Sequence, residues 1–305
     1  MSLLLSMLLG LFCLLYGMSI LRLGLERFAA DAFKRVLREM TITPWRGLWS
    51  GTAATALLQS STALTVMTIS FVDAGLIPFE NTLSLILGSN IGTTMTTQLL
   101  AFSLDSFIPY ILLLGALGFL FIPNRYRYLA LSVFGLGLLF LALYLLETGM
   151  APLAEVPVVQ QFLQQLGDHY LQGILAGTLL SALLHSSTAT TGLVMLLAEG
   201  GYLTLPTALA FIFGANIGTC FTTILASLAT NRAAQRVAVF HILLNVFGVL
   251  LFLPFLTPLA YLLEGLGGSL SRQVANAHTL FNLISSLVAF PFLPWATRFL
   301  TRVLK

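Results

Sequence analysis

Long apolar segments alternate with short polar ones along the whole chain. The apolar segments cover residues 3–25, 47–75, 79–103, 107–122, 126–149, 171–200, 205–230, 237–262 and 274–297. A helix of about 20 apolar residues crosses a bilayer core of about 30 Å, so most of these segments are long enough to span a membrane. No basic residue precedes the first segment, whereas a secretory signal carries one there, so we expect a retained first helix. The pattern predicts an all-α integral membrane protein.

Two of the apolar segments are interrupted by four consecutive polar side chains. The interruption in 47–75 is QSST at 59–62, and the interruption in 171–200 is HSST at 185–188. Each arm beside an interruption has only about 13 residues, which is too few for a helix to cross the membrane alone. The sequence therefore predicts that both segments are re-entrant helical hairpins, which enter the membrane and return to the same face.

A repeat relates the two interruptions. When the chain is shifted by 126 residues, 51–97 lies over 177–223 without a gap, and 20 of 47 positions are identical. The identities concentrate on Ser, Thr, Asn and Gly rather than on Leu. The chain is therefore predicted to consist of two related halves, 1–124 and 125–305, with an additional helix at the end of the second.

The basic residues predict a topology. If both hairpins are re-entrant, seven full crossings remain, and 13 of the 14 basic residues lie on one face, with only Arg272 opposite. This face is expected to be the cytoplasm of a plasma (inner) membrane, which places the N-terminus outside and the C-terminus in the cytoplasm. The basic, amphipathic stretch 26–40 is expected to lie on the membrane surface. Each half contains three crossings, so the second repeat is expected to be inverted, as in many secondary transporters.

The two interruptions have the chemistry of an anion site. Ser and Thr hydroxyls cap a new helix, whose first N–H groups and positive dipole end then point into the protein. The residues expected to bind the anion are Ser60, Ser61, Thr62, Ser186, Ser187 and Thr188. A single such motif could equally be helix packing, because small and hydroxyl residues are common at membrane helix interfaces. No Lys or Arg occurs in 47–124, 128–231 or 237–271, so the anion is expected to have no fixed cationic partner and to depend on co-bound cations.

A second pair of motifs predicts a cation site. GSNIGT at 88–93 and GANIGT at 214–219 carry glycines that are expected to let each helix unwind and break. Freed carbonyls and the neutral oxygens of Asn and Thr would then suit a small hard cation such as sodium. The residues concerned are Asn90, Thr93, Thr94, Thr96, Thr97, Asn216, Thr219, Thr222 and Thr223.

Three of the four histidines leave alternatives open. His185 replaces the Gln59 of the first half, and it is a ligand, a proton-carrying group, or a neutral donor that holds the interruption in place. His241 with Asn245, and His278 with Asn282, share a four-residue spacing. An ionisable residue within the membrane is a functional candidate, but these pairs could instead hydrogen-bond each other or the hairpins.

Composition excludes several other classes. The chain is 58% hydrophobic and only 8% charged, against about 25% charged residues in soluble domains. The net charge of +3 is a topology signal rather than a sign of nucleic-acid binding. Cys13 and Cys220 lie in apolar segments without a His partner, so neither a disulfide nor a metal cluster is predicted. No catalytic pair of carboxylates or Ser–His–Asp arrangement occurs in the membrane segments, and we do not expect an enzyme.

The combined motifs resemble those of one family. QSST with GSNIGT, repeated as HSST with GANIGT, together with HILLN at 241–245, resemble the type II sodium–phosphate cotransporter family, in a short prokaryotic-type form. The resemblance covers about 47–290. It implies sodium-driven symport of inorganic phosphate by alternating access, with sodium as co-substrate and no other cofactor. The sequence departs from the family pattern at His185, where the family usually has Gln. No His-x-x-x-Asn helix follows the GSNIGT segment, which leaves the sodium stoichiometry open.

The resemblance also implies roles for individual residues. Phosphate would be bound by the hydroxyls of both interruptions and by Asn90 and Asn216. Sodium would be bound by Gln59, Thr93, Thr97, Thr219, Thr222 and Asn245. Modulating roles would fall to His185, His241, His278 and Asn282. The expected partners are phosphate, sodium and the lipid bilayer, and a homodimer is left open. Another small anion, proton coupling through His185, or a phosphate exporter or channel are the alternative functions.

Overall fold

The structure is a computed structural model that describes residues 3–28, 43–102, 104–154 and 169–304. Within these ranges the secondary structure is helical and contains no strand, which agrees with the predicted fold class. Most of the basic stretch 26–40 lies outside the described residues. The helices in chain order are α1 Leu3–Phe28, α3 Pro44–Leu58, α4 Ser61–Asp73, α5 Phe79–Leu100, α6 Ile108–Phe121, α7 Tyr126–Ala154, α9 Tyr170–Leu184, α10 Ser187–Glu199, α11 Leu205–Ser227, α12 Arg232–Phe252, α13 Leu256–Leu266, α14 Leu270–Ala289 and α15 Leu293–Val303.

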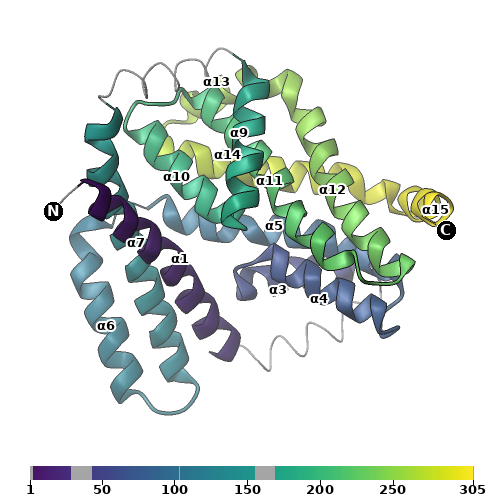
Figure 1. The fold of residues 1–305 in the computed structure, drawn as a ribbon, viewed down its shortest axis with the longest axis horizontal. Coiled ribbons are helices and arrows are strands. Elements are labelled where there is room, and N and C mark those ends of the chain that lie inside the picture. The colour runs from purple at the N-terminus through teal and green to yellow at the C-terminus, as the bar shows by residue number, and fades with distance from the viewer. Residues whose placement is uncertain (1–2, 29–42, 103, 155–168, 305) are drawn as a thin grey trace.

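Three helices form a bundle beside the rest of the molecule. Figure 1 shows α1, α6 and α7 side by side at the lower left, whereas α5, α11, α12 and α14 lie in the larger body. We call these parts the bundle and the body. Glycines let α1 and α7 approach closely, since a Cβ at Gly17 would lie 3.1 Å from the carbonyl oxygen of Gly135. The bundle contacts the body through α1 on α3 and α7 on α10.

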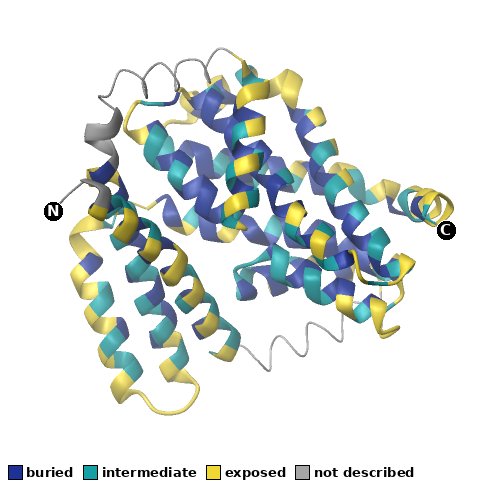
Figure 2. Cartoon of the chain, viewed as in Figure 1, coloured by how far each residue is buried: buried dark blue, intermediate teal, exposed yellow. Residues whose placement is uncertain are grey.

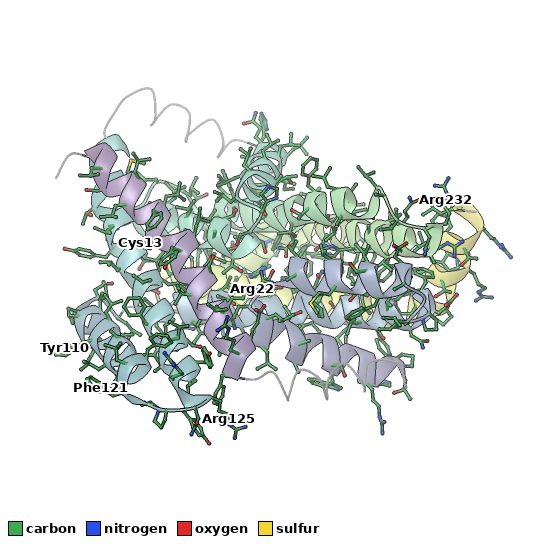
Figure 3. The ribbon with its side chains drawn as sticks, turned by 60° about the horizontal axis from the view of Figure 1, so that its bottom comes forward. Cys13, Arg22, Tyr110, Phe121, Arg125 and Arg232 are labelled. Atoms are coloured by element: carbon green, nitrogen blue, oxygen red, sulfur yellow. The ribbon has the colours of Figure 1, made fainter. Side chains whose placement is uncertain are left out.

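The outer surface of the bundle is apolar. Figure 2 shows much of α6 in the colour of exposed residues, although the helix is built almost wholly from Ile, Leu, Phe, Gly and Tyr. Tyr110 and Phe121 are 70% and 78% exposed, and Figure 3 shows both at the edge of the molecule. A helix that is apolar on its exposed face is typical of contact with lipid.

In the described part of the chain, five helices are candidate membrane spans, or six when one bent pair is included. By length and composition, the described helices long and apolar enough to cross a membrane lie at Leu5–Phe28, Tyr126–Gly149, Leu205–Ser227, Arg232–Leu266 and Leu270–Val303. The pair Phe79–Leu100 and Asp105–Phe121 meets the same criteria jointly but is bent by 80°. The prediction from the sequence counts these two helices as separate crossings. The total of seven crossings, and the inverted orientation that depends on it, stay predictions.

Both predicted interruptions end one helix and begin another. Helix α3 ends at Leu58 and α4 begins at Ser61, while α9 ends at Leu184 and α10 begins at Ser187. The helix ends at each break because the first residue of the break, Gln59 or His185, has a left-handed backbone conformation. Each of these residues is followed by a serine in extended conformation. The position of each break is therefore confirmed, and the re-entrant path through a bilayer stays a prediction.

The prediction that GSNIGT and GANIGT unwind is wrong. Helix α5 continues through 88–93 and α11 continues through 214–219. The glycines instead allow close packing: a Cβ at Gly88 would collide with the carbonyl oxygen of Leu48 in α3, and a Cβ at Gly214 with that of Ile174 in α9. Glycine serves both purposes, unwinding and close approach of backbones. Because neither helix breaks here, neither provides the freed carbonyls that the predicted sodium cage required.

We predict that Gly214→Ala destabilises the protein although alanine is the better helix former by about 1 kcal/mol. The new methyl must push α9 away from α11, and such overpacking costs about 1–3 kcal/mol. Thermal unfolding of the detergent-solubilised protein measures the effect as a lower midpoint. The matched control is Gly265→Ala in α13, where a Cβ would meet no atom within 4 Å. Equal midpoints for the two variants would contradict the close packing of α9 on α11.

Candidate functional site

A cavity of about 220 Å³ lies between the two interruptions. Both interruptions contribute to its wall, as do α1 of the bundle and one threonine each from α5 and α11. Its lining comprises Leu15, Met18, Ser19, Arg22, Gln59, Ser60, Ser61, Thr62, Thr93, Leu184, His185, Ser186, Ser187, Thr188 and Thr219. The six hydroxyl residues expected to bind an anion, from segments more than 120 residues apart in the chain, thus share one cavity.

Two helices begin at the cavity wall, and each begins with a serine cap. Ser60 Oγ accepts a hydrogen bond from Ala63 N at 3.1 Å, and Ser186 Oγ accepts one from Ala189 N at 3.1 Å. The predicted caps are therefore confirmed. The first backbone bond within α4 runs from Leu64 N to Ser60 O, so the preceding N–H groups have no partner inside the helix. Two positive helix ends therefore border the cavity.

The side-chain hydroxyls that follow each cap have no partner among the described residues. Ser61, Thr62, Ser187 and Thr188 line the cavity, and none of their hydroxyls forms a hydrogen bond within the described residues. Ser61 and Ser187 are largely buried, with 7% and 4% of their surface exposed. A hydroxyl can both donate and accept. The cavity therefore presents four free hydroxyls to a small polar ligand.

The residue before each serine cap is left-handed and is held by its side chain. Gln59 has φ 53° and His185 has φ 51°, a conformation that costs about 1–2 kcal/mol in residues other than glycine. The Gln59 side-chain oxygen accepts a hydrogen bond from the hydroxyl of Thr96, and His185 Nδ1 pairs with Thr222 Oγ1 at 2.7 Å. These two contacts recur at the 126-residue spacing. His185 thus has the contact that a group holding the interruption in place requires.

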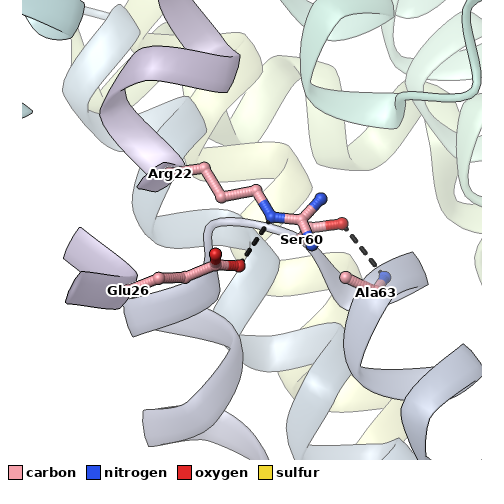
Figure 4. Close-up of polar contacts among 4 residues, drawn as sticks. All are labelled: Arg22, Glu26, Ser60 and Ala63. Carbon is pink, nitrogen blue, oxygen red and sulfur yellow. Dashed lines mark hydrogen bonds and ion pairs between the residues drawn. The ribbon is translucent and has the colours of Figure 1, made fainter. Parts of the chain in front are cut away.

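The prediction that no fixed cation faces the anion is wrong. Arg22 of α1 lines the cavity, and its Nε donates to Glu26 Oε1 at 2.8 Å. Figure 4 shows the Arg22 guanidinium beside the turn at Ser60. The sequence interpretation places Arg22 with the other basic residues of the cytoplasmic face, but α1 continues to Phe28 and Arg22 lines the cavity together with the interruptions. The sequence signal for this position of Arg22 was a charged residue within the otherwise apolar segment 3–25.

The remaining predicted site residues divide into a group that lines the cavity and a group that does not. The predicted sodium ligands Gln59, Thr93 and Thr219 line the cavity, whereas the lining lacks Asn90, Thr97, Asn216, Thr222, His241, Asn245, His278 and Asn282. A binding role for this second group stays a prediction.

Hydrogen bonds of the second group join α12 and α14 to α5 and α11. Asn90 Nδ2 donates to Asn245 Oδ1 at 3.1 Å. His278 Nδ1 pairs with Thr97 Oγ1 at 3.0 Å, and its Nε2 pairs with Asn216 Oδ1 at 3.3 Å.

His241 has the equivalent partner in the other half. Its Nδ1 pairs with Thr223 Oγ1 at 3.2 Å, and Thr223 lies 126 residues after the Thr97 that pairs with His278. Both histidines are buried. His241, Asn245 and His278 thus bond the helices that carry the GxNxGT motifs, whereas Asn282 donates to the backbone oxygen of His278. Among the described residues, neither pair bonds the other pair or the interruptions.

Two further polar groups were not found from the sequence. The hydroxyls of Thr55 and Ser181 are buried and have no hydrogen-bond partner among the described residues. Both lie one turn before an interruption, and they occupy equivalent positions at the 126-residue spacing. Buried hydroxyls without partners are uncommon in proteins. The sequence signal for these hydroxyls was that Thr55 and Ser181 align in the repeat. It was obscured because the two residue types differ.

The fold and the cavity define a helical membrane protein built around two paired helix interruptions, and sequence comparison gives its family. The family model described as Na+/Pi-cotransporter matches residues 13–148 and 143–268. The chain belongs to this family. No solved structure matches the chain.

Three relatives illustrate the range of the family. The uncharacterised protein YqeW of Bacillus subtilis is 34% identical over 279 residues, which are 91% of this chain and 90% of YqeW. The proposed inorganic phosphate export protein YjbB of Salmonella typhimurium is 31% identical over 96% of this chain. The match covers 54% of YjbB, so this chain spans about half of that relative. Sodium-dependent phosphate transport protein 2A of Oryctolagus cuniculus is 36% identical over 75 residues, 25% of this chain and 11% of that protein.

We predict that His185→Gln keeps the protein stable and that His185→Ala does not. Glutamine restores the residue found at the equivalent position 59, and its side chain can bond Thr222, whereas alanine loses a hydrogen bond of about 1 kcal/mol and leaves the left-handed residue unsupported. Thermal unfolding in detergent measures both variants. Leu183→Ala, at a side chain that is 78% exposed, is the control. If glutamine destabilises as much as alanine, the side-chain contact with Thr222 does not hold the interruption.

Proposed function

We propose that the protein is a sodium-coupled transporter of inorganic phosphate in the plasma membrane. The observation that carries the proposal is the cavity at which two capped helix ends meet, with four hydroxyls that have no partner in the described protein. Family membership supports the same substrate, because the family model is that of a phosphate cotransporter.

Phosphate fits the donors that surround the cavity. A tetrahedral oxyanion offers acceptors in several directions, and here hydroxyls and helix N–H groups approach from both interruptions. Helix N-termini are favourable places for phosphate because their free N–H groups and dipoles act together. Of the fully charged side chains, only Arg22 lines the cavity among the described residues, and Glu26 neutralises part of its charge.

Sodium coupling follows from this charge balance. A doubly charged oxyanion would exceed the positive charge supplied by the helix ends and by one arginine already paired with a carboxylate. Co-bound sodium would supply the difference. Thr93 and Thr219 line the cavity and donate their hydroxyl protons to the carbonyls of Ser89 and Asn216, so that their oxygen lone pairs face outward for a cation. The buried hydroxyls of Thr55 and Ser181, which have no partner among the described residues, would be further candidate oxygen ligands, although they do not line the cavity.

Alternating access is the mechanism that the arrangement favours. The interruptions belong to the body, and α1 of the bundle closes the cavity from the other side. Movement of the hairpins relative to the bundle would open the cavity to one side of the membrane and then to the other. The recurrence of the Gln59–Thr96 contact as His185–Thr222 supports two equivalent halves acting on one central site.

Phosphate export is the second candidate. YjbB, which aligns with 96% of this chain, is named as a proposed phosphate exporter. The same cavity would serve export, because a cyclic carrier runs in the direction set by its gradients. Another small anion and proton coupling through His185 are the remaining alternatives, and a channel would differ in lacking saturation.

Transport of labelled phosphate by reconstituted proteoliposomes tests the proposal. We predict saturable uptake that requires an inward sodium gradient and collapses when sodium is replaced by choline. Uptake that ignores sodium but follows a pH gradient would overturn sodium coupling in favour of protons, and a non-saturating flux would indicate a channel.

We also predict that Ser61→Ala and Ser187→Ala each raise the phosphate KM about tenfold, since each removes a hydroxyl that binds the charged substrate, worth about 1.5–3 kcal/mol. Ser70→Ala is the matched control, because Ser70 lies on the same helix as Ser61 but is exposed and bonded to Val66 O. Normal transport by both cavity variants would show that the interruptions are not the phosphate site.

A further inference from the structure

Arg22 has unused hydrogen-bonding capacity that faces the cavity. Its guanidinium uses only Nε, which donates to Glu26. Within the described residues, no hydrogen bond joins its two Nη atoms to the protein, although together they carry four N–H donors. Arg22 lines the cavity and Glu26 does not. The free edge of the guanidinium is therefore available to a ligand that lies between the two interruptions.

An oxyanion in the cavity would be a suitable partner for a cation that binds two oxygens at once. Arginine binds two oxygens of one oxyanion with parallel hydrogen bonds, a geometry that lysine cannot reproduce. The interruptions present hydroxyls and helix N-termini to the cavity. Arg22 comes from a different helix, α1, and so can contact oxygens that the interruptions leave free.

Glu26 lies one helical turn beyond Arg22 and has two opposing effects. Its ion pair at 2.8 Å fixes the guanidinium, while its negative charge weakens the attraction of Arg22 for an incoming anion. Both side chains are partly exposed, at 42% and 33%, so the pair itself adds little to stability. A weak pair that has little structural value but borders a ligand cavity is well placed to set affinity.

We propose that Arg22 binds the transported oxyanion through its free Nη edge, and that Glu26 limits the strength of this binding. The proposal rests on the proposed function, because the oxyanion is taken to be phosphate. Arg22 belongs to α1 and lies outside both interruptions. It would add a positive charge and a bidentate geometry to a set of donors that is otherwise neutral.

Equilibrium binding of labelled phosphate to the purified full-length protein, at saturating sodium, tests the proposal with four variants. Arg22→Gln is expected to raise Kd at least tenfold. Arg22→Lys should raise Kd less, because it keeps the charge and loses the bidentate geometry. Glu26→Gln is expected to lower Kd severalfold, since it removes a neighbouring negative charge. Arg27→Gln is the matched control: Arg27 lies in the same helix, bonds Tyr128 and does not line the cavity, so its Kd should stay within twofold of the unmodified protein.

The outcomes separate this proposal from the proposed function. Binding by the unmodified protein with an unchanged Kd in Arg22→Gln would overturn the role of Arg22 alone. A Kd that rises in Glu26→Gln would overturn the opposing role of Glu26. Absence of phosphate binding by the unmodified protein, which retains its cooperative thermal transition, would overturn the proposed function. Thermal midpoints of all variants without phosphate distinguish lost binding from lost folding, and Arg22→Lys provides the conservative variant if Arg22→Gln fails to fold.

Discussion

The structure depends on one constraint: backbone polar groups at membrane depth must find partners within the protein or line a polar cavity. At Gln59 and His185 the helical ladder stops, and each break is completed in the same way. A left-handed residue is held by a threonine of the neighbouring helix, and a serine then caps the next helix. The N–H groups that remain without partners border the cavity. The proposed anion site would thus be a direct result of how the protein accommodates two broken helices.

Local chemistry made part of this arrangement predictable. The interruptions and serine caps follow from runs of polar residues in apolar segments, and the 126-residue spacing alone relates the two interruptions to each other. GSNIGT and GANIGT show the limit of such inference. Glycine permits both an unwound helix and a closely packed one, and only the presence of α3 against α5, and of α9 against α11, decides between them. Arg22 could not be placed for a similar reason, because its neighbours come from distant segments.

The hydrogen bonds of α12 and α14 show how partner choice depends on tertiary structure. The sequence displays two His-x-x-x-Asn spacings but cannot indicate which helix each will meet. In the structure His241 pairs with Thr223 and His278 with Thr97, two threonines at equivalent positions of the repeat. Each of α12 and α14 therefore contacts both α5 and α11. The His278–Thr97 bond links the second half of the chain to the first, whereas the His241–Thr223 bond lies within the second half.

The position of Arg22 would give a bound oxyanion a mechanical role. Arg22 belongs to the bundle and the serine caps belong to the body, and these two parts contact each other at few elements. An anion that bonds both would act as a reversible cross-link, so the loaded protein would be stiffer across this boundary than the empty one. Displacing the interruptions along α1 would then require breaking the arginine bonds first. In such an arrangement the cargo supplies part of the barrier to its own passage, and the two orientations of the carrier would release it at different rates.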